Sequence, residues 1–218
     1  MEKEFCFTEV CSQEELKAFD GLYDNIEVDP YVKEGYRFKN IMRVRAKVEQ
    51  NEVVKGPHEP LFQSKKYNPV HGDIVREYTE IPSDYHNHIL YRTILTYAAK
   101  CGIGYEKEIL VQAQRIKCNK ALVGLTAVEG PHSDGKEFVA IFCINRQNVE
   151  GGVSQILEYG GEKVIHSEMI EPGSMMIVDD REYFHYATPV TCIDESVDGF
   201  RDIFIFSTPS SRPSEILY

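Results

Sequence analysis

The stretch GPHSDGKEFVAIF, residues 130–142, joins a turn rich in glycine and proline to an apolar run typical of a buried strand. His132 and Asp134 stand just before that run. Side chains two residues apart in a strand point to the same side of a sheet, so the imidazole and the carboxylate could reach one point in space. Taken alone, the pair fits a polar turn better than a metal site, because His and Asp at this spacing are common by chance.

Short apolar segments of the same character recur from residue 106 onward, at intervals of roughly 8–12 residues. Turns such as NVEGG and EPGS separate them, a pattern that predicts an antiparallel sandwich or barrel. The segments are KEILVQAQRIKC (107–118), KEFVAIFCIN (136–145), VSQILEYG (153–160), KVIHSEMI (163–170), SMMIVDD (174–180) and FRDIFIFS (200–207).

The N-terminal part predicts helices instead. In CSQEELKAFDGLY (11–23), Ser12 and Glu15 have the spacing of a capping box, and apolar residues follow at helical intervals. A second helix is predicted across HILYRTILTYAAKCG (88–102), where Gly102 can end it.

We therefore predict an α+β protein that is mainly β, folded as one domain over residues 1–218. Residues 1–105 would form a helical and mixed support region, and residues 106–218 would form the β core. The helices are expected to pack on the outside of one sheet.

Composition excludes several classes of partner. The formal net charge of −11 argues against a broad surface for nucleic-acid phosphates, which needs clustered Lys and Arg. The N-terminal residues have no basic start followed by an apolar core, and no run approaches the length of a membrane span. The six cysteines are scattered and contain no C-x-x-C pair, which favours reduced thiols. We expect a cytoplasmic protein with a small-molecule substrate and no nucleic-acid or membrane partner; the oligomeric state cannot be predicted.

A metal site at His132 and Asp134 would need a third ligand. The candidate is His185, which follows a predicted strand and a short polar connection in PGSMMIVDDREYFHYATPVT (172–191). In a barrel, this segment can lie opposite residues 132–134. Two His and one carboxylate leave three metal positions open, as in non-haem Fe(II) oxygenases, although zinc also remains possible.

Other histidines compete for this role. His86 and His88 precede a predicted helix, where residues two apart do not share a face, so we interpret them as surface or capping residues. His166 lies in a predicted strand and is interpreted as a polar strand residue.

Arg201 opens the last predicted strand, sixteen residues after His185. It could form a surface ion pair with Asp198 or Asp202. Alternatively, it could reach into the mouth of the barrel and bind a carboxylate in the two-pronged geometry that Lys cannot reproduce. The metal triad makes the second interpretation the stronger one.

These segments together resemble the Fe(II)/2-oxoglutarate-dependent dioxygenases of the double-stranded β-helix fold, a jelly-roll, cupin-like fold. The resemblance rests on PHSDG (131–135), GGVSQI (151–156), PGSMMIVDDREYFHYATPV (172–190) and Arg201. More narrowly, the chain resembles the branch that includes the bacterial L-isoleucine 4-hydroxylases. That resemblance covers nearly the whole chain and rests on DPYVKEGYRFKNIMRVR (29–45), LFQSKKYNPVHGDIVREY (61–78) and HSDGKEFVAIFCINRQNVEGGVSQI (132–156).

The resemblance implies that His132, Asp134 and His185 bind Fe(II) and that Arg201 binds the distal carboxylate of 2-oxoglutarate. Many relatives carry Ser or Thr two residues after this Arg, where this chain has Ile203.

The resemblance further implies that residues 121–130 form a strand facing the pocket, in which Thr126 contributes a hydrogen bond to the cosubstrate. Gln114 and Arg115 are predicted pocket residues, Gln114 toward the cosubstrate.

The implied activity is hydroxylation of a free, mainly aliphatic L-amino acid, with Fe(II), 2-oxoglutarate and O2 as cofactor and cosubstrates and release of succinate and CO2. The same chemistry on another small molecule or a protein side chain is an alternative. A non-catalytic cupin-like metal-binding protein is a third, but it would have no need for a carboxylate-binding Arg201.

Overall fold

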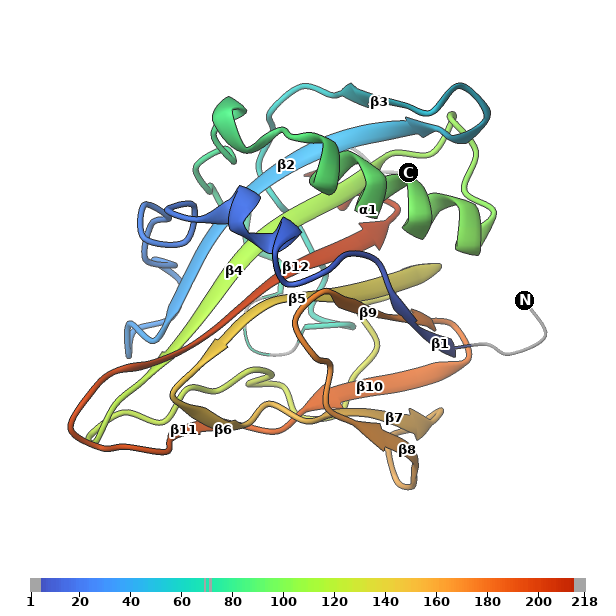
Figure 1. The fold of residues 1–218 in the computed structure, drawn as a ribbon. Coiled ribbons are helices and arrows are strands. Elements are labelled where there is room, and N and C mark those ends of the chain that lie inside the picture. The colour runs from blue at the N-terminus through green and yellow to red at the C-terminus, as the bar shows by residue number, and fades with distance from the viewer. Residues whose placement is uncertain (1–4, 69, 71, 214–218) are drawn as a thin grey trace.

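The computed structural model describes residues 5–68, 70 and 72–213, and shows a large sheet that faces smaller ones (Figure 1). Within these residues the large sheet has seven strands in the order β1-β9-β5-β12-β4-β2-β3, and every neighbouring pair is antiparallel. The bounds are Phe5–Glu9 (β1), Ser174–Asp179 (β9), Phe138–Gln147 (β5), Gly199–Thr208 (β12), Ile109–Cys118 (β4), Arg37–Lys47 (β2) and Glu52–Lys55 (β3).

The second layer lies below the large sheet in Figure 1. It contains the sheet β10-β7-β8 and the pair β11-β6. The bounds are Tyr183–Ala187 (β10), Ser154–Glu158 (β7), Val164–Glu168 (β8), Val190–Cys192 (β11) and Val149–Gly151 (β6). The predicted mainly β class with a jelly-roll core is confirmed, and each of the six predicted C-terminal segments forms a strand.

Alternation along the strands gives the large sheet two different faces. On β12, Phe204 and Phe206 belong to the main core cluster, whereas Arg201, Ile203 and Ile205 line a pocket on the opposite side. The outer face therefore carries most of the core, and the inner face is available for a site.

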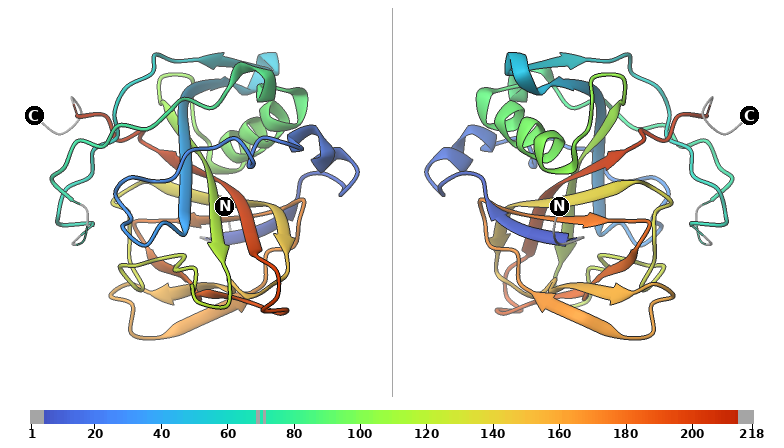
Figure 2. Two further views of the ribbon diagram at one scale, coloured as in Figure 1. Left: turned by 90° about the vertical axis from the view of Figure 1, so that its left-hand side faces the viewer. Right: turned by 90° about the vertical axis from the view of Figure 1, so that its right-hand side faces the viewer.

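Helix α1 (His88–Cys101) covers the outer face, away from the small sheets (Figure 2). The side chain of Asn87 caps its start by accepting hydrogen bonds from the N–H groups of Ile89 and Leu90. Gly102 takes the left-handed conformation at its end, with φ of 64°. This confirms the predicted helix, its stop and its place outside one sheet.

The first predicted helix is shorter than expected. Residues 11–23 contain only a 3-10 helix, η1 (Glu15–Phe19), followed by Gly21 with φ of 82°. The predicted capping box forms, because Ser12 N–H donates to Glu15 Oε2 at 2.9 Å. The positive φ at Gly21 turns the chain away before a full α-helix can develop. Two further 3-10 helices in the described part of the chain are η2 (Val48–Gln50) and η3 (Ser83–Tyr85).

The strand predicted across residues 121–130 is wrong. This segment makes only isolated bridges, Asn119 to Leu122 and Gly124 to Val190. Strand β4, which precedes it, is already paired on both edges by β2 and β12, so no ladder position remains beside it.

Strands from both parts of the chain share the large sheet, since β1, β2 and β3 lie in it beside β4, β5, β9 and β12. The single domain over residues 1–218, with a support region over 1–105 and a core over 106–218, stays a prediction. Among the described residues, no helix is long and apolar enough to cross a membrane.

Candidate active site

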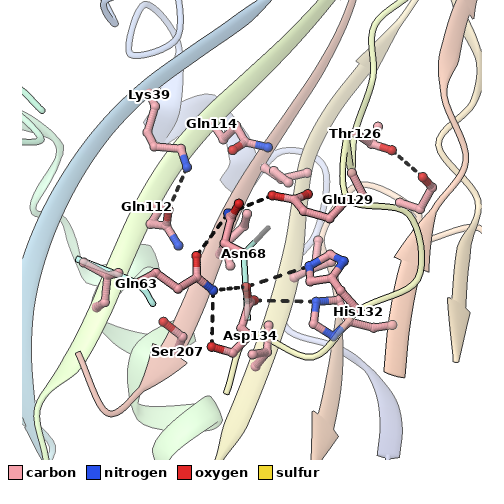
Figure 3. A pocket seen from close by; sticks show the side chains of 18 of the residues that line it. Lys39, Gln63, Asn68, Gln112, Gln114, Thr126, Glu129, His132, Asp134 and Ser207 are labelled. Carbon is pink, nitrogen blue, oxygen red and sulfur yellow. Dashed lines mark hydrogen bonds and ion pairs between the residues drawn. The ribbon is translucent and has the colours of Figure 1, made fainter. Parts of the chain in front are cut away.

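A pocket opens between the inner face of the large sheet and the strand β10 (Figure 3). Its walls come from β2, β4, β5 and β12, from the connecting segment around residues 126–136, and from Leu61, Gln63, Asn68 and Arg76. Polar and charged side chains occupy part of the wall, and Val139, Ile141, Ile203, Ile205 and Leu110 form an apolar part.

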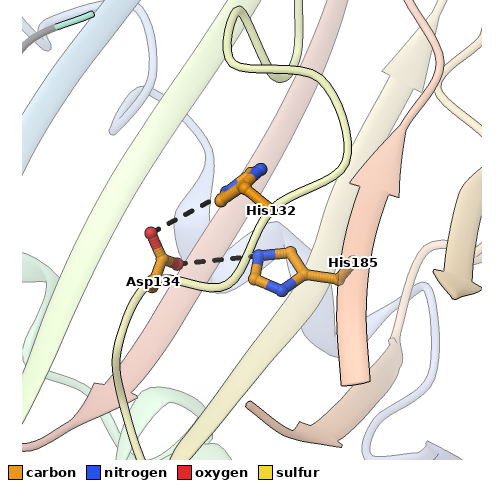
Figure 4. Close-up of side chains that lie close together, drawn as sticks. All are labelled: His132, Asp134 and His185. Atoms are coloured by element: carbon orange, nitrogen blue, oxygen red, sulfur yellow. Dashed lines mark ion pairs between the residues drawn. The ribbon is translucent and has the colours of Figure 1, made fainter. Parts of the chain in front are cut away.

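His132, Asp134 and His185 meet in this pocket (Figure 4). One potential ligand atom from each lies within 4.8 Å of the others, and the chain as described contains no second group of this kind. His132 Nε2 lies 3.8 Å from Asp134 Oδ1, and His185 Nε2 lies 3.6 Å from Asp134 Oδ2. The sequence prediction that these three residues converge agrees with this geometry.

Backbone pairing places the two imidazoles side by side. His132 N–H donates to the His185 carbonyl at 3.1 Å, and His185 N–H donates to the His132 carbonyl at 2.8 Å. As direct cross-strand partners, their rings come to a centroid distance of 4.5 Å. The regular strand β5 begins only at Phe138, so Asp134 lies in the turn before the strand, and the shared strand face considered for His132 and Asp134 does not form.

The buried carboxylate of Asp180 shapes that turn. It accepts hydrogen bonds from Ser133 Oγ at 3.0 Å, Asp134 N–H at 3.2 Å and Lys136 N–H at 2.8 Å. Its Oδ1 also lies 3.3 Å from His185 Nδ1, an ion-pair distance without aligned hydrogen-bond geometry. One side chain thus orients two of the three converging residues, as carboxylates do behind metal-binding histidines.

Both imidazoles present Nε2 to the centre. His132 Nδ1 lies 2.8 Å from the carbonyl of Gly130, which can only accept, so Nδ1 carries the proton. At His185, the negative charge of Asp180, 3.3 Å from Nδ1, favours a proton on that nitrogen. Two ring nitrogens and a carboxylate are then directed at one point, which is the donor set of a metal centre.

The charges at this centre are strongly coupled. Burial would lower the pKa of His185, but Asp134 and Asp180 outweigh it and raise the pKa from 6.5 to about 10. Burial would raise the pKa of Asp134, yet His185, His132 and a hydrogen bond from Gln63 bring it well below its usual range. The carboxylate is therefore ionised, and without a metal His185 acts as its counter-ion.

Metal binding should depend on pH for this reason. A metal ion must displace a proton from His185, so we expect about one proton released per ion bound between about pH 7 and pH 9, and an apparent affinity that rises about tenfold per pH unit. The stability of the metal-stripped protein should change with pH in the opposite direction. The raised pKa of His185 contributes stability that is complete below pH 6.5 and is lost as pH rises toward about 10. Chelator competition with Co(II) across this range measures the affinity, and a flat profile would contradict the assignment.

Arg201 reaches the same pocket as a buried, largely unpaired guanidinium. It is 1% exposed, and its Nε and Nη2 have no hydrogen-bond partner among the described residues. Burial lowers its pKa to about 10; Cys143 opposes this change and neighbouring Arg146 adds to it. A buried charge without a partner is costly, so this group fits an anionic ligand.

Two features support that interpretation of Arg201. The acids that could have formed a surface ion pair with it are used elsewhere, since Asp202 binds Arg115 at 2.7 Å and Asp198 binds Lys117 at 2.7 Å. Gly152 also leaves room for it, because a Cβ there would lie 2.9 Å from Arg201 Cδ. The surface ion pair considered from the sequence is therefore wrong.

Of the other predicted pocket residues, Gln114 and Arg115 lie on opposite faces of β4, and Thr126 lies in the segment that follows it. Gln114 lines the pocket and is buried, whereas Arg115 points to the opposite face, where it binds Asp202 and Asp24; its prediction as a pocket residue is wrong. Thr126 also lines the pocket, but its hydroxyl donates to the carbonyl of Ala187. Its hydrogen bond to the cosubstrate, like that of Gln114, stays a prediction.

Several pocket residues were not singled out from the sequence. Polar residues at alternate positions of a buried strand were the available signal: Lys39 on β2 and Gln112 on β4 face the pocket and hydrogen-bond at 3.0 Å. Burial lowers the pKa of Lys39 to about 7, with Arg37 acting in the same direction. Other residues lie in loops and gave no such signal; they are Gln63, Asn68, Arg76 and Glu129.

The chain is similar in sequence to a protein family and to a dioxygenase, and in structure to solved proteins. The model of the 2OG-Fe dioxygenase family matches residues 20–207. The 3(1)-hydroxy-L-isoleucine 4-dioxygenase of Pantoea ananatis is 27% identical over 204 residues, which cover 89% of this chain and 81% of that protein. A bsmA homolog from Methylobium petroleophilum has a similar structure, with a TM-score of 0.77, 22% identity and coverage of 96% of this chain and 89% of that one. The structure of IDO from Bacillus thuringiensis gives a TM-score of 0.74 at 18% identity, covering 97% of this chain and 92% of that one.

Proposed function

Because the chain belongs to the 2OG-Fe dioxygenase family, we propose that it hydroxylates the side chain of a free, mainly aliphatic L-amino acid. The protein is an Fe(II)- and 2-oxoglutarate-dependent dioxygenase that uses O2 as its second cosubstrate. We assign iron binding to His132, Asp134 and His185, and binding of the distal carboxylate of 2-oxoglutarate to Arg201.

One observation carries this assignment: three converging ligand atoms and an unpaired buried guanidinium line the same pocket. Two imidazole nitrogens and one carboxylate fit Fe(II) and leave coordination positions for other ligands. The Nε and Nη2 atoms of Arg201 fit a carboxylate. The residues present therefore fit both the metal and the cosubstrate.

In the reaction, the protein's part is to hold iron and 2-oxoglutarate in place and to shield the reacting centre from water. When bound, iron and 2-oxoglutarate supply the oxidative decarboxylation to succinate and CO2 that drives hydroxylation of a C–H bond. Asp180 and the Gly130 carbonyl keep protons on the outer nitrogens of His185 and His132, so that both Nε2 atoms remain available to bind iron. The apolar wall excludes water from the reacting centre.

Two observations support an aliphatic amino acid as the substrate. The Pantoea relative is named for a hydroxylated L-isoleucine, and its similarity covers most of both chains. In addition, Val139, Ile141 and Ile205 offer branched aliphatic surface in the same pocket as the charged groups. An amino acid with a charged end and an apolar side chain fits such a pocket.

The substrate class is tested with matched compounds. We expect turnover of free L-isoleucine, L-leucine or L-methionine to differ in degree, because one methylene changes transition-state binding by roughly 1–3 kcal/mol. The N-acetyl form of the best substrate should be much poorer, since it loses the ammonium charge and leaves its acidic partner unpaired. Mass spectrometry measures the gain of one oxygen in each compound. Equal or better hydroxylation of a peptide carrying the same residue would reject the free amino acid and favour a protein side chain.

A further inference from the structure

We propose that Arg76 and Glu129 form the subsite for the charged end of the substrate, with Arg76 binding the α-carboxylate and Glu129 binding the α-ammonium. This inference rests on the proposed function, because it requires a free amino acid. It identifies two residues, neither of them a candidate metal ligand, that would determine which class of molecule the enzyme accepts.

Arg76 is a second buried guanidinium with unused donors. It is 3% exposed, lines the pocket, and its Nε has no hydrogen-bond partner in the described part of the chain. Its Nη2 makes one long hydrogen bond, 3.4 Å, to Oε1 of Gln63. Its backbone is held in place by paired hydrogen bonds of 2.8 Å with Leu61. No described carboxylate lies within ion-pair distance of Arg76, so an anion that enters the pocket would supply the missing partner.

The other cations of the pocket are already engaged. Arg37 forms an ion pair with Asp29 at 2.7 Å, and Lys39 donates to Gln112 at 3.0 Å. Lys136 donates to the carbonyl of Pro209 at 2.8 Å and to Ser211. Since Arg201 is assigned to 2-oxoglutarate, Arg76 is the cation best suited to bind a second carboxylate.

Glu129 supplies the opposite charge. Among the residues that the structure describes, two acidic side chains line the pocket. One is Asp134, which faces the two imidazoles, and the other is Glu129. Its Oε1 accepts a hydrogen bond of 2.8 Å from Asn68, and no ion pair with a described cation occupies it. A partly buried carboxylate with a spare oxygen suits an ammonium group.

A hydrogen-bonded relay holds the two charges beside the candidate iron site. Asn68 Nδ2 donates both to Glu129 and to Gln63 Oε1, the latter at 3.2 Å, and Figure 3 shows these links. Gln63 in turn donates to Asp134 Oδ1 at 3.0 Å. Gln63 thus separates Arg76 from Asp134 by a single side chain. An amino acid anchored at Arg76 and Glu129 would therefore lie about one side chain away from the candidate iron site.

The test removes each charge from the protein and from the substrate in turn. Wild type, Arg76→Gln, Arg76→Lys and Glu129→Gln are compared on the best free amino acid, on its carboxamide, which lacks the carboxylate, and on the des-amino acid, which lacks the ammonium. Substrate affinity is measured by calorimetry on the Zn(II)-loaded protein with 2-oxoglutarate, and kcat/KM is measured on the iron enzyme. Thermal unfolding of every variant reports its folding.

We expect each substitution to weaken binding mainly of those compounds that still carry the charged group it contacts. Arg76→Gln should lower affinity for the free amino acid by about ten- to a hundredfold, the effect of a lost charge-assisted contact, while changing affinity for the carboxamide much less. Glu129→Gln should remove the preference over the des-amino acid and keep the preference over the carboxamide. The affinity of Arg76→Lys for the free amino acid should lie between those of wild type and Arg76→Gln, because lysine keeps the positive charge but lacks the planar guanidinium.

Two outcomes would overturn the proposal. If Arg76→Gln and Arg76→Lys bind all three compounds with the same loss, the residue has a structural role; if both bind them as wild type does, it has no role in the subsite. Failure of the proposed function looks different, because wild type itself would then neither bind nor hydroxylate any free amino acid.

Discussion

Replacing His185 by alanine is expected to reduce turnover to background while leaving the fold intact. Loss of residues that only orient a metal ligand costs about 10–100-fold in metal affinity, so loss of the ligand itself should cost more than that. His185 sits on β10 with its Nε2 3.6 Å from Asp134, and neither of the other converging residues can take its position. Iron content after dialysis, succinate release and circular dichroism together measure the effect.

The matched control is His88→Ala. His88 is exposed on α1, on the outer side of the sheet, so that variant should keep wild-type iron content and activity. Alanine at His132 or Asp134 should behave as His185→Ala does. Normal turnover of His185→Ala at wild-type iron stoichiometry would show that the metal centre has been assigned to the wrong residues.

Arg201→Lys should weaken binding of 2-oxoglutarate tenfold or more, which corresponds to about 1.4 kcal/mol. Lysine keeps a positive charge but offers one ammonium in place of the planar fork, so a two-pronged carboxylate contact becomes a single one. The site is fully buried, where water cannot replace the lost contact. Iron binding should change little, because Arg201 is not one of the converging ligands.

The control for Arg201 is chemical. 2-Oxovalerate has the keto acid of 2-oxoglutarate but lacks its distal carboxylate, so the wild-type enzyme should bind it poorly. Arg201→Lys should lower affinity for 2-oxoglutarate and leave affinity for 2-oxovalerate nearly unchanged, as calorimetry on the Zn(II)-loaded protein can measure. An unaltered 2-oxoglutarate affinity in the variant would remove Arg201 from the cosubstrate site.

The β core could be predicted from the sequence because its strands are short apolar runs bounded by turns. Strand β2 (Arg37–Lys47) was harder to recognise, since Arg37, Lys39 and Arg43 are buried charged residues on its inner face. Apolar and polar residues alternate cleanly only where one face is core and the other is water. Here the inner face lines a polar pocket, so the usual pattern fails where the site is built.

The convergence of His132, Asp134 and His185 was also predictable, because a His, an Asp two residues later and a distant His are a sequence pattern. The groups that orient them were not. Asp180 acts through a turn whose geometry requires the folded chain, and its neighbour Asp179 binds Arg181 instead, at 2.6 Å. Gln63 and Asn68 come from a long loop, where spacing carries no information about direction.

The most direct test of the account is the stoichiometry of succinate and hydroxylated product. The purified protein is incubated with Fe(II), 2-oxoglutarate and O2, and with a panel of free L-amino acids. We predict that at least one aliphatic amino acid gains one oxygen, in equal amount to the succinate formed, and that omitting iron or 2-oxoglutarate stops both. Oxygen gain that persists without 2-oxoglutarate, or succinate release that no free amino acid stimulates, would contradict the account.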